Sequence, residues 1–281
     1  MRHLYRRLLE RLLLDGVEQL NERTGKRVKV LRGGTSFSLD LKDGLLPVAG
    51  GRRLRPATAA KELAWFLSGS RDVRWLEERG CKIWSKFRDN AATDDISTAY
   101  GYRWRKYFGR DQIKLAIETL AREPSSRQVL VSAWSAMNDG LGEKAPNFPC
   151  PTHFTLWTLD RELHMSVFMR SSDVFVGLPY DVMGHALLLD ALAASLCRQG
   201  CQVWPGMMTF HLSHAHLYEP HWDMAHSVAE RGVDGDEGVV PMPGWPVDAI
   251  QSDPDVYIGL VKAAEDEAAW PKYDPRPELV L

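Results

Sequence analysis

The chain has 281 residues, of which 44% are hydrophobic and ten are tryptophan. This is enough apolar material for one large domain or two small ones with a substantial buried core, which excludes a disordered or fibrous protein. Its 35 Lys and Arg residues nearly balance its 37 Asp and Glu residues, so it lacks the overall positive charge of proteins that bind nucleic acid non-specifically.

No segment predicts a membrane anchor, a signal peptide or a disulfide framework. The longest apolar stretch, Ala186 to Leu196, falls well short of the ~18–20 residues that span a bilayer. The first residues lead into an amphipathic pattern that does not resemble a signal peptide. The four cysteines form no C-x-x-C pair, which favours reduced thiols with individual roles. We therefore expect a soluble protein of the cytoplasm, without a membrane or a direct nucleic-acid partner.

Two spacings of apolar residues alternate along the first half of the chain. Apolar residues spaced three and four apart indicate helices, and short β-branched or aromatic runs between turn residues indicate strands. In chain order they predict a helix at 4–20, strands at 28–31 and 35–39 on either side of Gly33-Gly34, a helix at 57–67, a polar segment at 88–110, a helix at 113–120, a strand at 129–134 and a loop at 135–149.

The second half predicts strands and one long helix, followed by a region rich in Pro, Gly and Asp. In chain order it predicts strands at 154–159 and 163–169 joined by a turn at 160–162, a helix at 182–196, a segment at 207–218 that opens as a strand, and short strands at 238–240 and 256–260. No repeat interrupts the pattern. We therefore expect one α+β domain over residues 1–281.

Cys150 is a candidate nucleophile because it lies between Pro149 and Pro151, where a loop meets a strand. Flanking prolines fix the backbone and keep the residue out of a regular ladder, which suits a presented thiol. The alternative is a packed structural thiol. A thiolate needs positive charge nearby, and Arg170, at the end of the following hairpin, is placed to fold back beside it.

The segment 170–181 gathers an arginine, two hydroxyls and two acids around a Gly and a Pro, just before the long helix. In a purely structural interpretation Asp181 is the N-cap of that helix. In the same interpretation Asp173 and Arg170 form a surface ion pair. A functional interpretation instead places these polar groups around a ligand.

Four histidines within 211–221, with a fifth at His226, raise the possibility of a metal site. On a strand, His214, His216 and Tyr218 share one face while His211 points the other way. No cysteine or carboxylate close in sequence completes a ligand set. Hydrogen bonds from His216 and Tyr218 to a ligand are therefore favoured over a metal, and we expect no metal.

Several motifs in this order resemble the thymidylate synthase family over about residues 5 to 276. The most specific are Pro149-Cys150, Arg170-Ser171-x-Asp173-Val174-Phe175-x-Gly177-Leu178-Pro179-Tyr180-Asp181 and His216-Leu217-Tyr218. Shorter matches are Arg23-Thr24-Gly25, Glu62-Leu63-x-Trp65-Phe66-Leu67, Ile83-Trp84, Tyr100-Gly101-x-x-Trp104-Arg105, Ser126-Arg127, Val131-Ser132-Ala133-Trp134 and Tyr273-Asp274-Pro275. The resemblance implies an α+β sandwich: a twisted mixed sheet with helices on one face and a homodimer interface on the other.

The resemblance also implies a role for each matching residue. The thiolate of Cys150 adds to C6 of a pyrimidine nucleotide, so that C5 can attack the methylene of 5,10-methylenetetrahydrofolate, the co-substrate. On this pattern Glu62 organises a proton-relay water and Tyr100 lies beside C5 and the thiol. The remaining roles are phosphate binding for Arg23, Arg170, Ser171 and, across the dimer interface, Arg127; sugar binding for His216 and Tyr218; and folate binding for Asp173, Trp84, Gly177 and Leu281.

Asp181 departs from the family, which has an asparagine there to read uracil. Uracil presents an N3–H donor and an O4 acceptor, whereas cytosine presents an N3 acceptor and an amino donor. A carboxyl that is protonated, or that shares a proton with N3, can donate to N3 and accept from the amino group, and a pocket built this way rejects the wrong base by leaving polar atoms unpaired. Asp181 therefore predicts cytosine, and the change resembles the deoxycytidylate hydroxymethylases of phages, in which case the protein acts in the host cytoplasm.

Three further departures favour addition of water to the exocyclic methylene, which gives a hydroxymethyl product. The family has a leucine where this chain has Asn147, and a histidine where it has Pro151. Only six residues follow Asp274-Pro275, so we expect a C-terminal lid that closes less tightly. Trp84 argues for the methyl product, because it matches a residue that shields the intermediate.

The nucleotide and the reaction therefore have alternatives. The leading hypothesis is hydroxymethylation of dCMP, with methylation of dCMP or hydroxymethylation of CMP as runners-up. Gln128 replaces an arginine usual in the family and fits neither sugar pattern. Proteins of other classes, a catalytically inactive nucleotide-binding homologue or a histidine-cluster metalloenzyme, are the remaining competitors.

Overall fold

The computed structural model describes residues 1–52, 54–142, 147–230, 240–244, 250 and 254–267. Within them, helices combine with sheets that contain both antiparallel and parallel strand pairs. This confirms the α+β fold class. Two sheets are present where the sequence predicted one. The sheets and the helices together position the candidate site residues, as described below.

The larger sheet has five strands in the order β3-β8-β6-β5-β4. Their bounds are β3 Thr35–Asp40, β4 Val129–Ser132, β5 Pro151–Leu159, β6 Glu162–Met169 and β8 Trp204–Leu212. β6 and β8 pair in parallel, whereas the other pairs are antiparallel. A parallel pair needs a crossover connection, and α6 (Leu178–Arg198) provides it.

The smaller sheet has four strands in the order β1-β2-β9-β7. Their bounds are β1 Val17–Asn21, β2 Lys26–Val30, β7 Ser172–Asp173 and β9 Ala215–Tyr218. β9 lies between β2 and β7, so it brings the N-terminal hairpin next to the segment that follows β6. Residues nearly 200 positions apart in the chain meet here, as Val28 and Tyr218 do.

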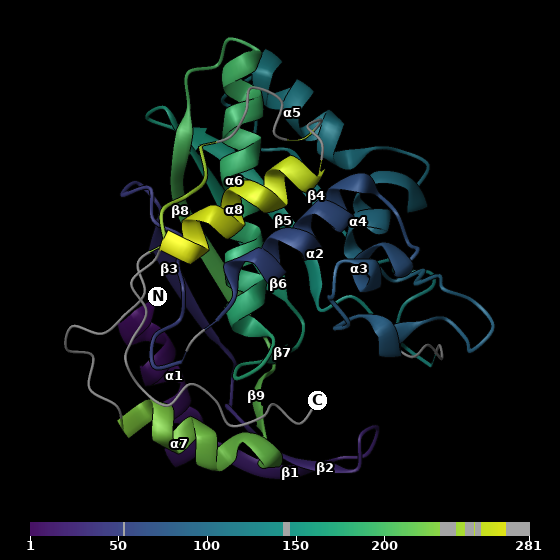
Figure 1. The fold of residues 1–281 in the computed structure, drawn as a ribbon, viewed down its shortest axis with the longest axis vertical. Helices are drawn as coiled ribbons and strands as arrows, with labels where there is room; N and C mark the ends of the chain where they lie inside the picture. Colours follow the sequence, from purple (N-terminus) through teal and green to yellow (C-terminus); the bar gives the residue numbers. More distant parts are fainter. Residues whose placement is uncertain (53, 143–146, 231–239, 245–249, 251–253, 268–281) are drawn as a thin grey trace.

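The helices form layers on one face of the larger sheet. α6 packs on β6 and β8, α2 (Pro56–Ser68) packs on α6, and α8 (Pro254–Glu267) packs on α2. Figure 1 shows α6 running alongside the strands, with α2 and α8 crossing it on the same side. The other helices are α1 Arg2–Asp15, α3 Arg74–Glu78, α4 Tyr100–Tyr102, α5 Gln112–Arg122 and α7 Trp222–Glu230.

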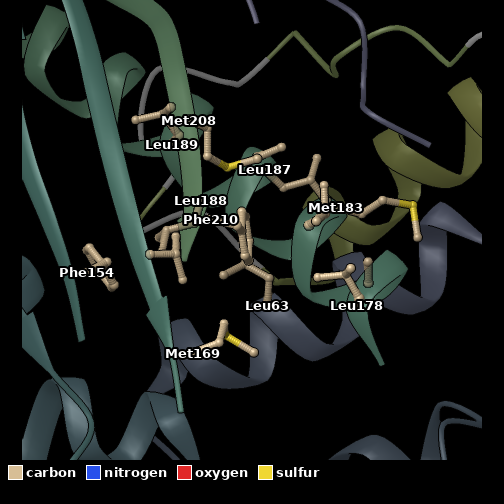
Figure 2. Close-up of a cluster of buried hydrophobic side chains, with 14 of the residues drawn as sticks. Leu63, Phe154, Met169, Leu178, Met183, Leu187, Leu188, Leu189, Met208 and Phe210 are labelled. Carbon is tan, nitrogen blue, oxygen red and sulfur yellow. The ribbon is translucent and has the colours of Figure 1, made fainter. Parts of the chain in front are cut away.

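The core lies between α6 and the larger sheet. Figure 2 shows leucine and methionine side chains of α6 lying against Phe154 of β5, Met208 and Phe210 of β8, and Leu63 of α2. These residues are almost fully buried. By length and composition α6 alone among the described helices is apolar enough to cross a membrane, but most of it is buried inside the protein, as in a soluble core helix.

The opposite face of the larger sheet carries rows of flat and small polar side chains. His153, Phe168 and His211 stack in one row across three strands, with ring centroids 4.4 and 4.5 Å apart. In the neighbouring row Ser38 and Thr209 share a hydrogen bond of 2.8 Å. We call this face, defined by His153, Phe168, His211, Ser38, Thr209 and Trp157, the outer sheet face.

Most predicted elements are confirmed, and three are corrected. The first helix ends at Asp15 and residues 17–21 form β1, because the backbone at Gly16 turns extended and a side chain there would overlap the carbonyl of Leu12. Leu20, expected on the apolar helix face, is 61% exposed. The strand predicted at 129–134 ends at Ser132.

The strand predicted at 256–260 is also wrong, because these residues belong to α8. Ile258 and Val261 are buried while Val256 is half-exposed, which is the three-residue spacing of a helix. The strand predicted at 238–240 lies almost entirely outside the described residues, as do the motif at 273–275 and Leu281.

Candidate active site

Side chains from four separate segments converge around Cys150. Glu62 comes from α2, Tyr100 from α4, Asp181 from α6, and Cys150 itself from the residue before β5. Gly101 allows this approach, because a Cβ at that position would overlap the backbone of Phe66 on α2. The charges of Tyr100, Cys150, Asp181 and Glu62 act on one another, so the four polar groups occupy one site.

Arg170 lies beside Cys150, as predicted. Its backbone N–H donates to the carbonyl of Cys150 at 2.9 Å, and its guanidinium donates to the carbonyls of Phe148 and Pro149 at 2.8 and 2.9 Å. The ring of Trp134 packs against that guanidinium. Both the backbone and the guanidinium of Arg170 are therefore bonded to the loop that presents the thiol, and they fix the end of that loop.

Taken together, these surroundings nevertheless raise the pKa of the Cys150 thiol. Burial raises the pKa of Cys150 above its ordinary value, and the charge of Arg170 opposes this without cancelling it. A hydrogen bond from Tyr100 also favours the thiolate, whereas the nearby Asp181 carboxylate disfavours it. The charge state of Asp181 therefore contributes to how readily the thiolate forms, besides burial and Arg170.

Glu62 accepts a hydrogen bond of 2.6 Å from the indole N–H of Trp84. Burial raises the pKa of Glu62 to about 7, and the bond from Trp84 only partly opposes that rise. A carboxyl that titrates near neutrality can both give and take a proton at physiological pH. Trp84 is 4% exposed and packs between Phe66 and Tyr100.

Asp181 lies in the first turn of α6 and is not its N-cap, which is Gly177. The interpretation of Asp181 as a helix cap is therefore wrong. The residue is half-buried, but protein surrounds its carboxyl. Burial raises the pKa of Asp181 well above its ordinary value, and the charges of Glu62 and Asp173 raise it further. The raised pKa favours the protonated carboxyl, which has one hydrogen to donate.

A small cavity of about 10 Å³, enough for one water molecule, lies between α2, α4 and α6. Glu62, Tyr100, Asp181 and His185 border it, although most of the surface that faces the cavity is apolar. Its remaining walls are Leu63, Phe66, Trp104, Tyr180, Gly184 and Leu188. The residues Glu62, Asp181 and His185 thus border one small cavity.

Asp173 holds the turn that begins α6. One oxygen of its carboxylate accepts from the backbone N–H groups of Phe175 and Val176, at 3.0 and 3.1 Å. The surface ion pair with Arg170 is not present, since both residues are described and Arg170 bonds elsewhere. The backbone N–H of Gly177 donates to the carbonyl of Asp173, so the predicted folate residues Asp173 and Gly177 adjoin Asp181.

The rim of the site carries the residues predicted to bind phosphate and sugar. Arg23 is exposed in the turn between β1 and β2, and its charge acts on Cys150, His216 and Tyr218. Burial lowers the pKa of His216 and raises that of Tyr218. Ser171 is half-buried directly after Arg170. Pairing of β9 with β2 and β7 is what brings these segments together.

Three predicted residues are not gathered here. Arg127 is exposed just before β4, away from the thiol. Asn147 is half-buried ahead of Pro149 and does not line the cavity. Leu281 lies outside the described residues.

The histidines of 211–226 are dispersed. His211 stacks in the outer sheet face, His221 is buried against Phe175, and His226 is exposed on α7. His214 lies in a bend before β9 and contacts His216, with ring nitrogens 3.3 Å apart. Over the part of the chain that the structure describes, no three His, Cys, Asp or Glu side chains are grouped to hold a metal.

Sequence reasoning missed His185, a buried residue that lines the cavity. It follows Asp181 by four positions, so the two lie on the same face of α6. That spacing is the signal that could have identified it. Its position in a long apolar helix made it hard to recognise, because a single histidine among leucines is usually a core residue.

Comparison with protein families agrees with this arrangement. The sequence model of a family described as thymidylate synthase matches residues 3–237. The match covers most of the chain. It includes Arg23, Glu62, Cys150, Asp181 and Tyr218, and it ends before α8.

Proposed function

The chain belongs to the thymidylate synthase family, and from this premise we propose that it converts dCMP to 5-hydroxymethyl-dCMP. The family establishes the coarser part: folate-dependent transfer of a one-carbon unit to a pyrimidine nucleotide, with 5,10-methylenetetrahydrofolate as co-substrate. We propose the base, the sugar and the product. The single observation that supports the base is the enclosed carboxyl of Asp181, whose pKa is held high.

In the proposed reaction the thiolate of Cys150 adds to C6 of cytosine, and the electron pair of the 5,6 double bond makes C5 a nucleophile. C5 attacks the methylene carbon of the folate and then loses its proton. Tetrahydrofolate leaves, which gives an exocyclic methylene. Water adds to that carbon and the thiolate is expelled from C6, so one water is consumed and the folate is not oxidised.

Asp181 supports cytosine as the base. A protonated carboxyl donates its hydrogen to N3 and accepts from the 4-amino group through its other oxygen. Uracil presents the opposite pattern, so the same carboxyl pairs with it only if the hydrogen moves to its other oxygen. The neutral state has a second benefit, because it removes the negative charge that would oppose the thiolate of Cys150.

Glu62 is suited to organise the proton transfers. Its pKa of about 7 lets it pass protons between the base and a bound water at neutral pH. The bond from Trp84 fixes one oxygen of its carboxyl and leaves the other free. Tyr100, hydrogen-bonded to Cys150, is placed to steady the thiol during attack.

Two residues bear on the product in opposite directions. Asn147, half-buried two positions before Pro149, favours the hydroxymethyl product as a polar replacement for leucine, although it lies outside the group of residues around the small cavity. Trp84 favours the methyl product, since its ring is buried against Tyr100 and can exclude water from the intermediate. Methylation of dCMP, with dihydrofolate as by-product, is therefore the second candidate.

The proposal includes a homodimer formed through the outer sheet face. Half-buried aromatic and hydroxyl side chains, such as Phe168 and Thr209, cover that face, and no described helix packs over it. Arg127, exposed at the edge of the same sheet, would reach the phosphate in the partner's site. Sedimentation or light scattering of the purified protein tests the dimer, and a monomer at micromolar concentration would contradict it.

Mass spectrometry of the nucleotide tests the reaction. Purified protein is incubated with methylenetetrahydrofolate and an equimolar mixture of dCMP, CMP and dUMP, while absorbance follows dihydrofolate. Gain of CH2O on dCMP without dihydrofolate supports the proposal. Gain of CH2 with dihydrofolate makes the protein a methyltransferase, and a product from CMP or dUMP overturns the assignment of sugar or base.

A further inference from the structure

Arg103 and Asp139 form an ion pair in the interior, which we call the buried pair. The guanidinium of Arg103 donates to both carboxylate oxygens of Asp139, at 2.9 and 3.2 Å, and both side chains are almost fully buried. Such a pair seldom adds net stability, because its attraction must first exceed the lost hydration of two charges. It does supply geometry, since a planar guanidinium with two bonds to one carboxylate fixes the distance and the angle between the segments that it joins.

The arginine of the pair belongs to the segment that carries Tyr100. Arg103 begins the π-helix η2 (Arg103–Tyr107), which directly continues α4. Its Nε donates to the carbonyl of Ser97 at 2.8 Å, and the ring of Tyr107 lies 3.8 Å from the centre of its guanidinium. One side chain thus contacts residues before and after Tyr100, and it fixes the short helix between them.

The aspartate of the pair belongs to the loop that follows Trp134. The carboxylate of Asp139 accepts from the backbone N–H of Ser135 at 2.7 Å, and its own N–H donates to the carbonyl of Ser135 at 3.0 Å. Gly140 then returns to Trp134, because a Cβ at that position would lie 3.1 Å from the indole ring. The carboxylate that binds Arg103 therefore also holds the backbone next to Trp134.

Trp134 connects this loop to the loop that presents the thiol. Its ring packs on the guanidinium of Arg170 and on the ring of Phe148, with centroid distances of 5.6 and 6.1 Å. Arg170 in turn donates to the carbonyls of Phe148, Pro149 and Cys150. A continuous series of contacts thus runs from the buried pair to the residue that carries the thiol.

We propose that the buried pair sets the position of Tyr100 against the thiol of Cys150. Tyr100 gives that thiol a hydrogen bond, although the two residues come from separate segments. Arg103 and Asp139 act through other residues, so they are positioning residues. The inference rests on the proposed function in taking Cys150 as the nucleophile, and it is independent of the base, the sugar and the product.

The test variant must remove the pair without leaving a buried charge unpaired. Arg103→Met/Asp139→Asn removes both charges, and the asparagine oxygen can still accept from the N–H of Ser135. Thermal unfolding establishes that this pair-free variant folds. If it does not fold, Arg103→Lys takes its place, because lysine keeps the charge and loses the planar fork.

The first test needs neither nucleotide nor folate. It measures how fast iodoacetamide alkylates Cys150 at pH 8, with and without Tyr100→Phe, in the wild-type and pair-free backgrounds. In the wild type, Tyr100→Phe should slow alkylation by about threefold to fivefold, because a bond that favours the thiolate is lost. In the pair-free background the same substitution should change the rate by less than about 1.5-fold, since the two groups are no longer held together.

A purely structural pair predicts equal slowing by Tyr100→Phe in both backgrounds, which overturns the inference. A wild-type rate that Tyr100→Phe leaves unchanged also overturns it. Asp111→Ser is the matched control, because Asp111 pairs with Arg105 of the same π-helix and a serine can still cap α5. Tyr100→Phe should keep its full effect in that background, and loss of the effect there would deny the buried pair its specific role.

The second test separates rate from binding. In the pair-free variant, kcat for tritium release from C5-labelled dCMP should fall by about tenfold or more, while the Kd for dCMP changes by less than about threefold. Weaker binding with an unchanged kcat would overturn the inference. If the wild-type protein releases no tritium from any pyrimidine nucleotide, the proposed function fails instead, and the alkylation rates still decide whether the pair positions Tyr100.

Discussion

The indole of Trp84 donates to the carboxyl of Glu62 at 2.6 Å, and both groups lie beside Tyr100. In the proposed mechanism this bond joins the proton carrier to the ring that would screen an intermediate, beside Tyr100 and the thiol. Because the bond joins the indole ring to the carboxyl, substitution of either residue should change both the proton transfers at Glu62 and the access of water to the site.

The pKa of Glu62 predicts a stability change with pH. Its pKa is raised on folding, so its contribution to stability is fully present below the unfolded value and is lost as pH rises towards about 7. Glu62→Gln should therefore be more stable than the wild-type protein at pH 8 relative to pH 5, by on the order of 2 kcal/mol. Urea unfolding at the two pH values measures this, and an equal difference at both would contradict it.

Replacement of the thiol should abolish turnover. Cys150→Ser is expected to lower the rate of tritium release from C5-labelled dCMP by at least about a thousandfold, because a hydroxyl is a far weaker nucleophile at neutral pH. Binding of dCMP should remain. Cys201→Ser serves as the matched control, since Cys201 bonds to the carbonyl of Ala121 away from the site. Full turnover in Cys150→Ser would remove the covalent mechanism.

Asp181→Asn should change the preferred base. An amide donates to O4 of uracil and accepts from its N3–H, so we expect the ratio of kcat/KM for dCMP over dUMP to fall by about a hundredfold or more. Asp173→Asn, a neighbouring carboxyl outside the base pocket, should weaken folate use and leave that ratio near its wild-type value. Competition between the two nucleotides, followed by mass spectrometry, measures the ratio.

Arg170 should control the reactivity of the thiol. Because its charge lowers the pKa of Cys150, Arg170→Gln is expected to slow alkylation of Cys150 by iodoacetamide at pH 8 by about fivefold to tenfold. Cys197, which is exposed, is an internal control whose rate should not change. Peptide mass spectrometry follows both cysteines in one sample, and equal slowing at both would point to a general effect on folding.

The buried pair of Arg103 and Asp139 should carry a large structural cost. Both side chains are almost fully buried, and they form two hydrogen bonds, at 2.9 and 3.2 Å. Asp139→Asn leaves the guanidinium without its counter-charge and should destabilise the protein by ~3–5 kcal/mol. The exposed pair of Lys114 and Glu118 is the control, and Glu118→Gln should change stability by less than ~0.5 kcal/mol.

Sequence patterns predicted the elements that are long or strongly periodic. The long helix, the hairpin at 154–169 and the loop that presents Cys150 were foreseen, because apolar spacing and flanking prolines are local signals. The end of the first helix was misplaced, since Leu20 continues the apolar spacing although Gly16 has already ended the helix. The true helix at 254–267 was hidden by a run of β-branched residues around Ile258.

Local patterns predicted less of the site. The motifs identified Cys150, Glu62 and Asp181, but no local signal states that Trp84 bonds to Glu62 or that Arg170 packs on Trp134. The net rise in the pKa of Cys150 could not be predicted from the sequence either, because it follows from burial by residues of separate segments. His185 was missed for the same reason: its importance lies in the cavity it borders.

The position of β9 between β2 and β7 has a consequence for how the chain acquires its structure. The N-terminal hairpin that carries Arg23 leaves the ribosome early, yet the strand that covers β2 is complete only when Tyr218 has been synthesised. Until then β2 presents an unpaired edge, and pairing across such a sequence separation is slow. Nascent chains shorter than about 220 residues therefore expose an unpaired strand edge and have not yet brought Tyr218 to the hairpin that carries Arg23.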